Sequence, residues 1–371
     1  MLRKSFRILY CASKANPSDS SSKIFRDVRN ALKESCSYDR NRNAISPDQI
    51  QEINRYLTQG RVSARGVSQA AWCLSKLMIT DHQIWGKVIL HLPAAFLTPG
   101  DAAITIFSLS RALQNEPSLL SEESKKALEV CVEMHVNSSA CFSEACSLCD
   151  CSQISFGLTS IFPLKPRMSL PFLRRATKLL QELPKSEGTE EVPLLGSCRD
   201  VCLLWSVARE RKAKGIKVGQ SFIEALCEAS RGLRNCSDFN QNKAAQVSES
   251  IASLNVGDPR VVFQVILFVD THRSEINGRN LLRIMRSMHA LGVDNPVLWR
   301  RIANRLEDAV GLGFDLKELE EIRWIFTKSS PRNQRVQGIL GLYIKTKQEF
   351  IQYDGLTIKR SLKKFQRYDF L

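Results

Sequence analysis

Pairs of short amphipathic segments recur along this chain, and neither member of a pair can bury its apolar side alone. In residues 69–92, Q-A-A-W-C-L-S-K-L-M-I-T-D-H-Q-I-W-G-K-V-I-L-H-L, the pattern predicts two helices broken at Thr80-Asp81, with Ser68 and Asp81 as N-caps. The apolar positions of the two helices follow helical spacing: Ala71, Leu74 and Met78, then Trp85, Ile89 and Leu92. Such helices need neighbours built in the same way.

Similar helical cores follow the first one at intervals of 35 to 49 residues. In each, a bulky or polar anchor precedes an apolar residue at the second position and a small or polar residue at the third. The anchors are Trp72, Phe107, Phe156, Trp205, Glu249, Arg286 and Trp324. The recurrence predicts an all-α protein in which about seven divergent helix-turn-helix units over residues 46–345 stack as an α-solenoid. An irregular all-helical protein remains the alternative.

The second helix of a unit is clearest late in the chain. Residues 258–269 and 294–306 both begin with an Asp or Asn cap, at Asp258 and at Asp294-Asn295, and have proline at or next to the first helical position, where its missing N–H costs nothing. In the later segment Leu298, Ile302 and Leu306 form the expected buried edge. Apolar/polar alternation typical of strands is scarce, so sheet-containing folds are disfavoured.

Positive charge is concentrated at the two ends of the chain. The net charge is +15; residues 1–45 hold ten Lys/Arg against four acidic residues, and residues 331–371 hold nine against three. We expect a nearly neutral array with a basic N-terminal arm (1–45) and a basic C-terminal tail (346–371), an arrangement suited to reaching a polyanion such as RNA. Solvated charged tails without a ligand are the alternative.

The first residues, M-L-R-K-S-F-R-I-L-Y-C-A-S-K-A-N-P, contain four basic residues and no acid before Asp19. This Arg-rich, amphipathic composition is typical of a mitochondrial presequence and lacks the apolar core of a secretory signal, so we expect location in the mitochondrial matrix. A basic tail that is never cleaved is the alternative. The 12 cysteines are expected to be reduced, because nothing directs secretion.

Motifs for catalysis are missing from the sequence. It contains no G-x-x-x-x-G-K-S/T, G-x-G-x-x-G, H-E-x-x-H or G-x-S-x-G, and its five histidines are scattered. We therefore expect no enzymatic activity, no cofactor and no small-molecule substrate. No apolar run approaches the length of a transmembrane span.

One cysteine cluster suggests a metal site but is disfavoured by its spacing. Thiolates chelate Zn²⁺ or iron–sulfur clusters, and S-A-C-F-S-E-A-C-S-L-C-D-C-S (139–152) holds Cys141, Cys146, Cys149 and Cys151. Structural zinc sites generally pair two separated knuckles, whereas these ligands would have to surround a metal from one segment. Cysteine also packs as a small hydrophobe between helices, and we expect that role here.

Arginines and lysines in the last third of the chain are the candidate RNA-binding residues. Arg279, Arg283 and Arg286 fall at i, i+4 and i+7, on a face separate from the apolar stripe of residues 278–291. Three exposed guanidinium groups in a line can each hold a phosphate or stack on a base, although such a stripe can also be a simple solvent face. The following helix and the C-terminal tail extend the set with Arg300, Arg301, Arg305, Lys359, Arg360, Lys363, Lys364 and Arg367.

The segments A-A-W-C-L-S-K-L, I-T-I-F-S-L-S-R-A-L and I-M-R-S-M-H-A-L, followed by second helices such as G-V-D-N-P-V-L-W, resemble divergent helical-repeat proteins of organellar gene expression. These are the octotricopeptide and heptatricopeptide types, related to the repeat regions of RAP-domain and FAST-kinase-like proteins. The resemblance covers about residues 66–345. It implies an α-solenoid that binds RNA or ribonucleoprotein in mitochondria or plastids, with first helices lining its inner surface.

Two functions follow from this reading. The first is a mitochondrial ribosome subunit or assembly factor that contacts ribosomal RNA and neighbouring ribosomal proteins through its basic extensions. The second is a protein-only scaffold, such as an accessory subunit of a respiratory-chain or ATP-synthase assembly. Solenoids serve both roles, because fold does not fix function.

Overall fold

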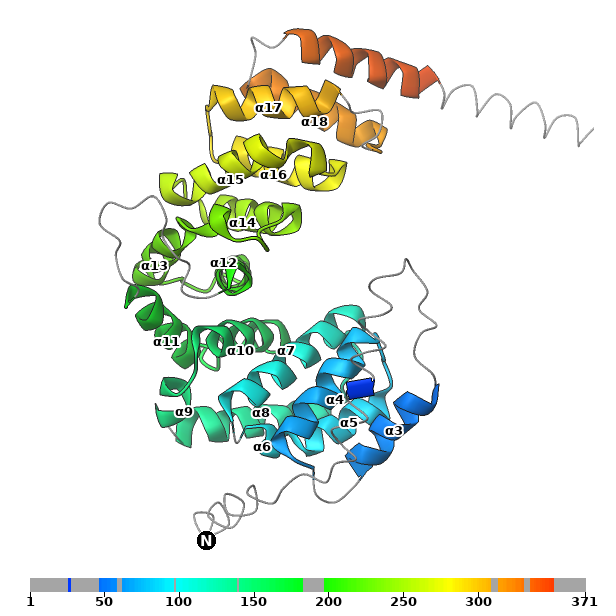
Figure 1. Ribbon diagram of the computed structural model, residues 1–371, viewed down its shortest axis with the longest axis vertical. Coiled ribbons are helices and arrows are strands. Elements are labelled where there is room, and N and C mark those ends of the chain that lie inside the picture. Colours follow the sequence, from blue (N-terminus) through cyan, green and yellow to red (C-terminus); the bar gives the residue numbers. More distant parts are fainter. Residues whose placement is uncertain are drawn as a thin grey trace, which may run out of the picture. The chain divides into compact units, whose positions relative to one another are not determined.

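The computed structural model describes residues 26–27, 47–58, 62–96, 98–138, 140–182, 197–307, 313–329 and 334–349 (Figure 1). These residues form α-helices joined by turns and short 3₁₀ segments, and no strand is present among them. The prediction of an all-α protein is confirmed. Most of the N-terminal arm and residues 350–371 lie outside the described residues. The last described helix covers residues 334–349, so it runs past the predicted start of the tail at residue 346.

The chain divides into two compact units, Met1–Glu187 with Leu195–Leu226, and Gly188–Leu194 with Cys227–Leu371. In the first unit four helices lie side by side, each packed on the next (Figure 1). They are α4 (Ala64–Lys76), α7 (Pro99–Asn115), α10 (Leu148–Ile161) and α12 (Cys198–Ala213). The first four sequence anchors all lie in these helices. The intervening helices are α3 (Pro47–Thr58), α5 (His82–Leu90), α6 (Leu92–Ala95), α8 (Glu122–Ser138), α9 (Ala140–Glu144), α11 (Leu170–Gln181) and α13 (Gln220–Ser230), whose end belongs to the second unit.

The second unit repeats this plan. Helix α16 packs between α14 and α18, and α15 packs against α17. The last three anchors lie in α14, α16 and α18. The helices are α14 (Gln241–Leu254), α15 (Pro259–His272), α16 (Gly278–Ala290), α17 (Pro296–Glu307) and α18 (Leu316–Ser329), followed by the helix over 334–349.

The same turn closes four helix pairs. In each, one residue takes a left-handed conformation and the next backbone N–H bonds to a carbonyl five residues earlier, which satisfies an end carbonyl of the first helix. These bonds run from Ile79 to Leu74 (3.0 Å), Ile216 to Arg211 (2.9 Å), Val256 to Ile251 (2.8 Å) and Val293 to Met288 (2.9 Å). The left-handed residues are Met78, Gly215, Asn255 and Gly292, with φ of 54°, 70°, 56° and 65°. One turn chemistry thus connects pairs in both units.

Caps begin the helices that follow these turns. The carboxylate of Asp81 accepts the backbone N–H groups of Gln83 and Ile84, and Asp258 accepts that of Arg260. Asn295 accepts the N–H of Leu298. The predicted break at Thr80-Asp81 and the caps at Asp81, Asp258 and Asn295 are confirmed.

Two details of the opening prediction were wrong. Ser68 is not a cap: Ser63 caps α4, and Ser68 lies buried in the second turn, where its hydroxyl donates to Asp101 of α7 at 2.6 Å. Met78 is not core: its left-handed backbone ends α4, and its side chain is 59% exposed. In both cases the helix begins or ends away from the position that apolar spacing implied.

Tryptophan side chains fill the cores beneath two of these turns. Trp85 and Trp299 stand at the fourth position of α5 and α17 and are almost fully buried. Each indole N–H donates at 2.8 Å to a carbonyl of the preceding turn, at Ile79 and Val293. Because the ring fills the core while its N–H satisfies the turn, the two pairs are closed in the same way. The predicted edge of Leu298, Ile302 and Leu306 is also buried.

Small residues set the spacing of the side-by-side helices. Ala70 and Ala71 in α4, and Ala102 and Ala103 in α7, are buried where these helices meet their neighbours. Helix α10 approaches the backbone of α7 closely at Gly157, where an added Cβ would lie 2.5 Å from a methyl and 2.9 Å from the carbonyl oxygen of Ile106. A glycine is therefore required there for α10 to pack on α7.

Candidate nucleic-acid interface

Helix α16 presents the first group of predicted RNA-binding arginines. Arg283 binds Glu249 of α14 through two guanidinium nitrogens, with Nη2 2.7 Å from Oε2, and also donates to Asn280. Arg286 binds Glu321 of α18 in the same bidentate manner, with Nε 2.6 Å from Oε1. These hydrogen bonds raise the pKa of both arginines, and the bond from Arg286 lowers that of Glu321. Arg279 is exposed and pairs with no other described residue.

Helix α17 shows a similar division. Arg301 forms an ion pair with Asp270 of α15, and Arg305 donates through two nitrogens to the carbonyl of Ile276, each at 3.1 Å. Arg300 is exposed, and its side chain has no ion-pair partner among the described residues. In α17, as in α16, some arginines are therefore bound to a neighbouring segment and one is not.

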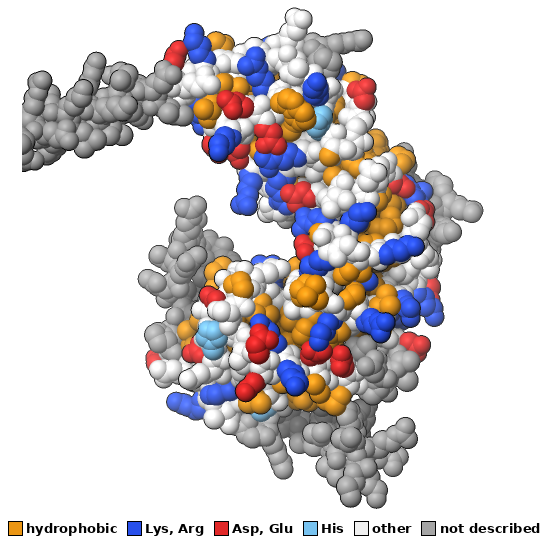
Figure 2. Space-filling view, turned by 180° about the vertical axis from the view of Figure 1, so that it is seen from behind, with side chains coloured by type: hydrophobic (Ala, Val, Ile, Leu, Met, Phe, Trp, Pro, Cys, Tyr) orange, Lys and Arg blue, Asp and Glu red, His pale blue; other side chains and the backbone are white. Residues whose placement is uncertain are grey.

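In the structure Arg279, Arg283 and Arg286 do not form one free line of guanidinium groups, and their part in RNA binding stays a prediction. Two of the three are bound to carboxylates supplied by the helices on either side, which a helical-wheel projection of one segment cannot reveal. Figure 2 shows one face of the molecule, on which Lys and Arg side chains are interspersed with Asp and Glu. Of the predicted residues in the two helices, Arg279 and Arg300 keep their charge free of a described partner.

The tail residues Lys359, Arg360, Lys363, Lys364 and Arg367 lie outside the described residues. Lys347, near the end of the last described helix, donates to the carbonyl of Phe314. Its ammonium group therefore ties that helix to the turn before α18.

The cysteine cluster is spread over α9, α10 and the turn between them, and its members differ in exposure. Cys146 and Cys151 are buried, and their contact together with burial raises the pKa of Cys151. Cys149 is exposed and accepts a hydrogen bond from Gln153 at 2.9 Å. The side chain of Cys141 lies outside what is described. Among the described side chains, no three that could ligate a metal ion come together.

Polar contacts between the first helices of successive helix pairs, such as α4 and α7, were not predicted from the sequence. Asp101 accepts the hydroxyl of its own cap, Thr98, at 2.7 Å and that of Ser68 in the preceding first helix at 2.6 Å. Asp200 does the same with Ser197 at 2.9 Å and Ser152 at 2.7 Å. The available signal was the spacing of Thr or Ser three residues before Asp at each helix start.

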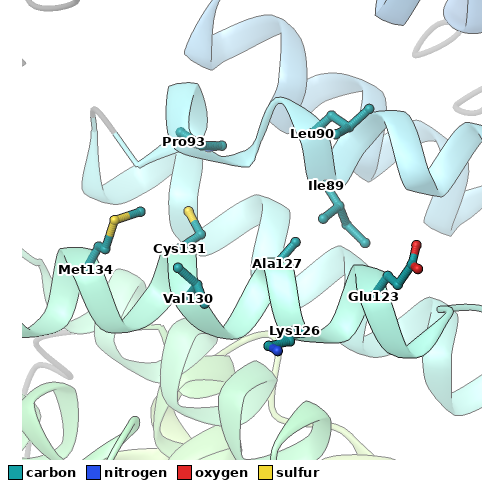
Figure 3. A pocket seen from close by; sticks show the side chains of 9 residues that line it. All are labelled: Ile89, Leu90, Pro93, Glu123, Lys126, Ala127, Val130, Cys131 and Met134. Atoms are coloured by element: carbon teal, nitrogen blue, oxygen red, sulfur yellow. The ribbon is translucent and has the colours of Figure 1, made fainter. Parts of the chain in front are cut away.

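An apolar groove lies between α5, α6 and α8 in the first unit (Figure 3). Its volume is about 460 Å³, and Leu90, Val130 and Met134 on its walls are 76%, 48% and 46% exposed. Cys131 lines the same groove, and burial raises the pKa of its thiol to about 12. Exposed apolar side chains of this size, gathered in one place, are typical of a protein-binding surface.

No protein-family model matches the chain, and no curated protein matches its sequence at a significant level. Among the helices of the described residues, none is both long enough and apolar enough to cross a membrane.

Proposed function

We propose that this protein is a non-catalytic, RNA-associated helical-repeat protein of the mitochondrial matrix. In this proposal its two units are parts of one α-solenoid, and it serves as a ribosome subunit or assembly factor. The RNA is ribosomal RNA, held mainly by the basic ends of the chain and by Arg279 and Arg300.

The placement of positive charge carries the proposal. The N-terminal 45 residues and residues 331–371 each have a net charge of +6. Between them most arginines of α16 and α17 are bound to carboxylates or carbonyls, whereas Arg279 and Arg300 have no described partner. A polyanion gains affinity from each cation that releases a counterion, and cations already paired contribute less.

Support for the solenoid comes from each unit separately. First helices lie side by side in both units, and the same left-handed turn joins first to second helices. The resemblance to organellar repeat proteins and the presequence-like N-terminus support the location and the kind of partner.

Salt-dependent RNA binding tests the proposal. Full-length protein is compared with a chain lacking residues 351–371, which keeps the last described helix intact, and with Arg279→Gln/Arg300→Gln. Each variant should weaken RNA binding and flatten the slope of log Kd against log salt, because phosphate contacts are lost. Lys217→Gln, which removes an exposed charge from the turn before α13, is the matched control and should change the slope less. Equal affinity and slope in all four proteins would overturn the role of the ends.

The apolar groove favours a second candidate, a protein-only scaffold in another mitochondrial complex. On that reading Leu90, Val130 and Met134 are covered by a partner protein. Co-sedimentation separates the two: a ribosome-associated protein leaves the particles as salt rises, whereas a scaffold stays with its complex through nuclease and salt.

A further inference from the structure

We propose that Trp72, Phe107 and Phe156 form a stacking platform for the bases of single-stranded RNA. These three residues, which we call the aromatic face, stand on the consecutive helices α4, α7 and α10 of the first unit. The inference rests on the proposed function and names a binding surface separate from the basic ends and from Arg279 and Arg300.

Contacts along the three helices place the rings at one level. Arg65 and Ser68 near the start of α4 both reach Asp101 near the start of α7. Helices α4 and α7 therefore run in the same direction with their starts level, and Trp72 and Phe107 each stand eight residues after the first residue of their helix. Between α7 and α10 the contact itself shows that the rings are level, because the ring centroids of Phe107 and Phe156 are 5.7 Å apart.

The rings stand at the edge of the helix–helix contact instead of within it. Gly157 lets α10 approach α7 closely, and the space between these helices is filled by Ile106 and by small side chains. Trp72, Phe107 and Phe156 keep intermediate exposure, whereas Trp85 of the same unit is fully buried. Part of each platform ring is therefore open to a ligand, and on Phe107 a ligand shares the ring with the Arg199 guanidinium.

Cations accompany the aromatic face. The Lys76 ammonium lies 6.0 Å from the Trp72 ring centroid, and the Arg199 guanidinium of α12 lies 4.8 Å from that of Phe107. Arg111, one turn beyond Phe107, is exposed. The carboxylates nearby are held at helix starts: Asp101 accepts two hydroxyls, and Asp150 closes the cap of α10.

This combination fits a single nucleic-acid strand better than a protein helix or a duplex. Every base has a π-face that stacks on an aromatic ring, and the neighbouring cations meet the phosphates. Arg199 adds a guanidinium plane on which a base can also stack. Bases in a duplex are already stacked on one another, so they gain nothing from the platform. Recognition should tolerate sequence, because stacking does not read base edges.

Binding of two RNAs by full-length protein tests the platform. The probes are a single strand and a duplex of the same sequence, each about 20 nucleotides long, which is more than the roughly 4–16 nucleotides that one OB fold covers. Replacing the three rings by leucine keeps an apolar side chain at each edge. Each Trp72→Leu, Phe107→Leu or Phe156→Leu change should weaken single-strand binding about tenfold and leave duplex binding unchanged.

Phe263→Leu is the matched control, since Phe263 is 51% exposed on α15 of the second unit and lies outside the platform. Circular dichroism checks that each variant folds. Independently, photocrosslinking of a 4-thiouridine-substituted single strand to the unaltered protein should give adducts on peptides that contain Trp72, Phe107 or Phe156.

The outcomes separate the two proposals. Single-strand binding that is salt-sensitive but indifferent to all three ring substitutions, with crosslinks only in the basic ends, would overturn the platform and leave the proposed function standing. Failure of the wild-type protein to bind either RNA at low salt would overturn both. Selective loss of single-strand binding together with crosslinks on the three helices supports both.

Discussion

The side-by-side helices of the two units carry different chemistry at the same position of the repeat. In α4, α7 and α10 that position holds the rings of Trp72, Phe107 and Phe156, which are partly buried. In α14 and α16 it holds Glu249 and Arg286, which bind Arg283 and Glu321 on neighbouring helices. The last helix of each row differs from its neighbours, because this position holds the buried Trp205 in α12 and the exposed Trp324 in α18. One packing geometry therefore supports an aromatic surface over α4, α7 and α10 and a charge-paired surface over α14 and α16.

The difference shows where the repeat is constrained. Small residues lie beneath both surfaces, with Ala102 and Ala103 in α7 matched by Ala244 and Ala245 in α14, five and four residues before the anchor of each helix. Close helix packing depends on these buried positions, whereas the edge position can take rings or ion pairs at little cost. The edge is therefore free to differ with function, and its chemistry suggests stacking in the first unit and neutralised charge in the second.

Removing a buried tryptophan from the core should destabilise the two units strongly and to a similar extent. Trp85→Ala and Trp299→Ala each remove a buried ring and the hydrogen bond that closes a turn. We expect each to lower the free energy of unfolding by about 3–5 kcal/mol, measured by urea denaturation followed by circular dichroism. Trp324→Ala is the control, because this ring is 55% exposed, and it should cost about 1 kcal/mol or less. Unequal losses at Trp85 and Trp299 would show that the two pairs are not equivalent.

Gly157→Ala should disturb the aromatic unit alone. The new methyl would meet Ile106 at distances that real Cβ atoms do not show, so α10 must move away from α7. We expect a loss of about 1–3 kcal/mol in the free energy of unfolding. Gly86→Ala in α5 meets nothing within 4 Å and should instead stabilise slightly, since alanine favours helix over glycine. If both variants melt at the wild-type temperature, the close approach does not govern this spacing.

Releasing the paired arginines should make the second unit bind RNA better. Glu249→Gln and Glu321→Gln remove the carboxylates that hold Arg283 and Arg286. Loss of these partly exposed pairs should cost about 1 kcal/mol or less in stability. RNA affinity at low salt should rise about two- to fivefold, because two cations become available for phosphates. An unchanged affinity would mean that α16 does not contact RNA. Glu320→Gln on the exposed side of α18 controls for the single unit of charge that each of the two substitutions changes when made alone.

The smallest expected effect is a pH dependence of the first unit. Burial lowers the pKa of His135 from 6.5, and its ring stacks on Phe96 at 4.7 Å. As pH falls below 6.5 the unfolded chain takes up the proton before the folded chain does, so stability present at neutral pH is lost towards the lower folded pKa. His135→Phe keeps the ring and should flatten the melting temperature between pH 7 and pH 5. A variant as pH-sensitive as the wild type would assign the effect to another group.

Helix positions followed from the sequence because their signals are local. The caps at Asp81, Asp258 and Asn295 lie next to the residues they cap, and the buried edge of α17 depends only on helical periodicity. The anchors also lie in helices, as predicted, because each was recognised from the spacing of residues within one or two helical turns. Fold class was therefore predictable without knowing which helices meet.

Partnership between helices was decided only by the tertiary structure. Arg283 and Arg286 looked alike as free cations, yet Glu249 and Glu321 bind them from 34 and 35 residues away. Ser68 looked like a cap because it is a serine that precedes an apolar run, but its hydroxyl donates a hydrogen bond to Asp101 of α7. The aromatic face depends in the same way on Gly157, whose role is set by the nearness of Ile106. Sequence spacing determines what one helix exposes, and only packing determines which of those groups a neighbour neutralises, covers or leaves for a ligand.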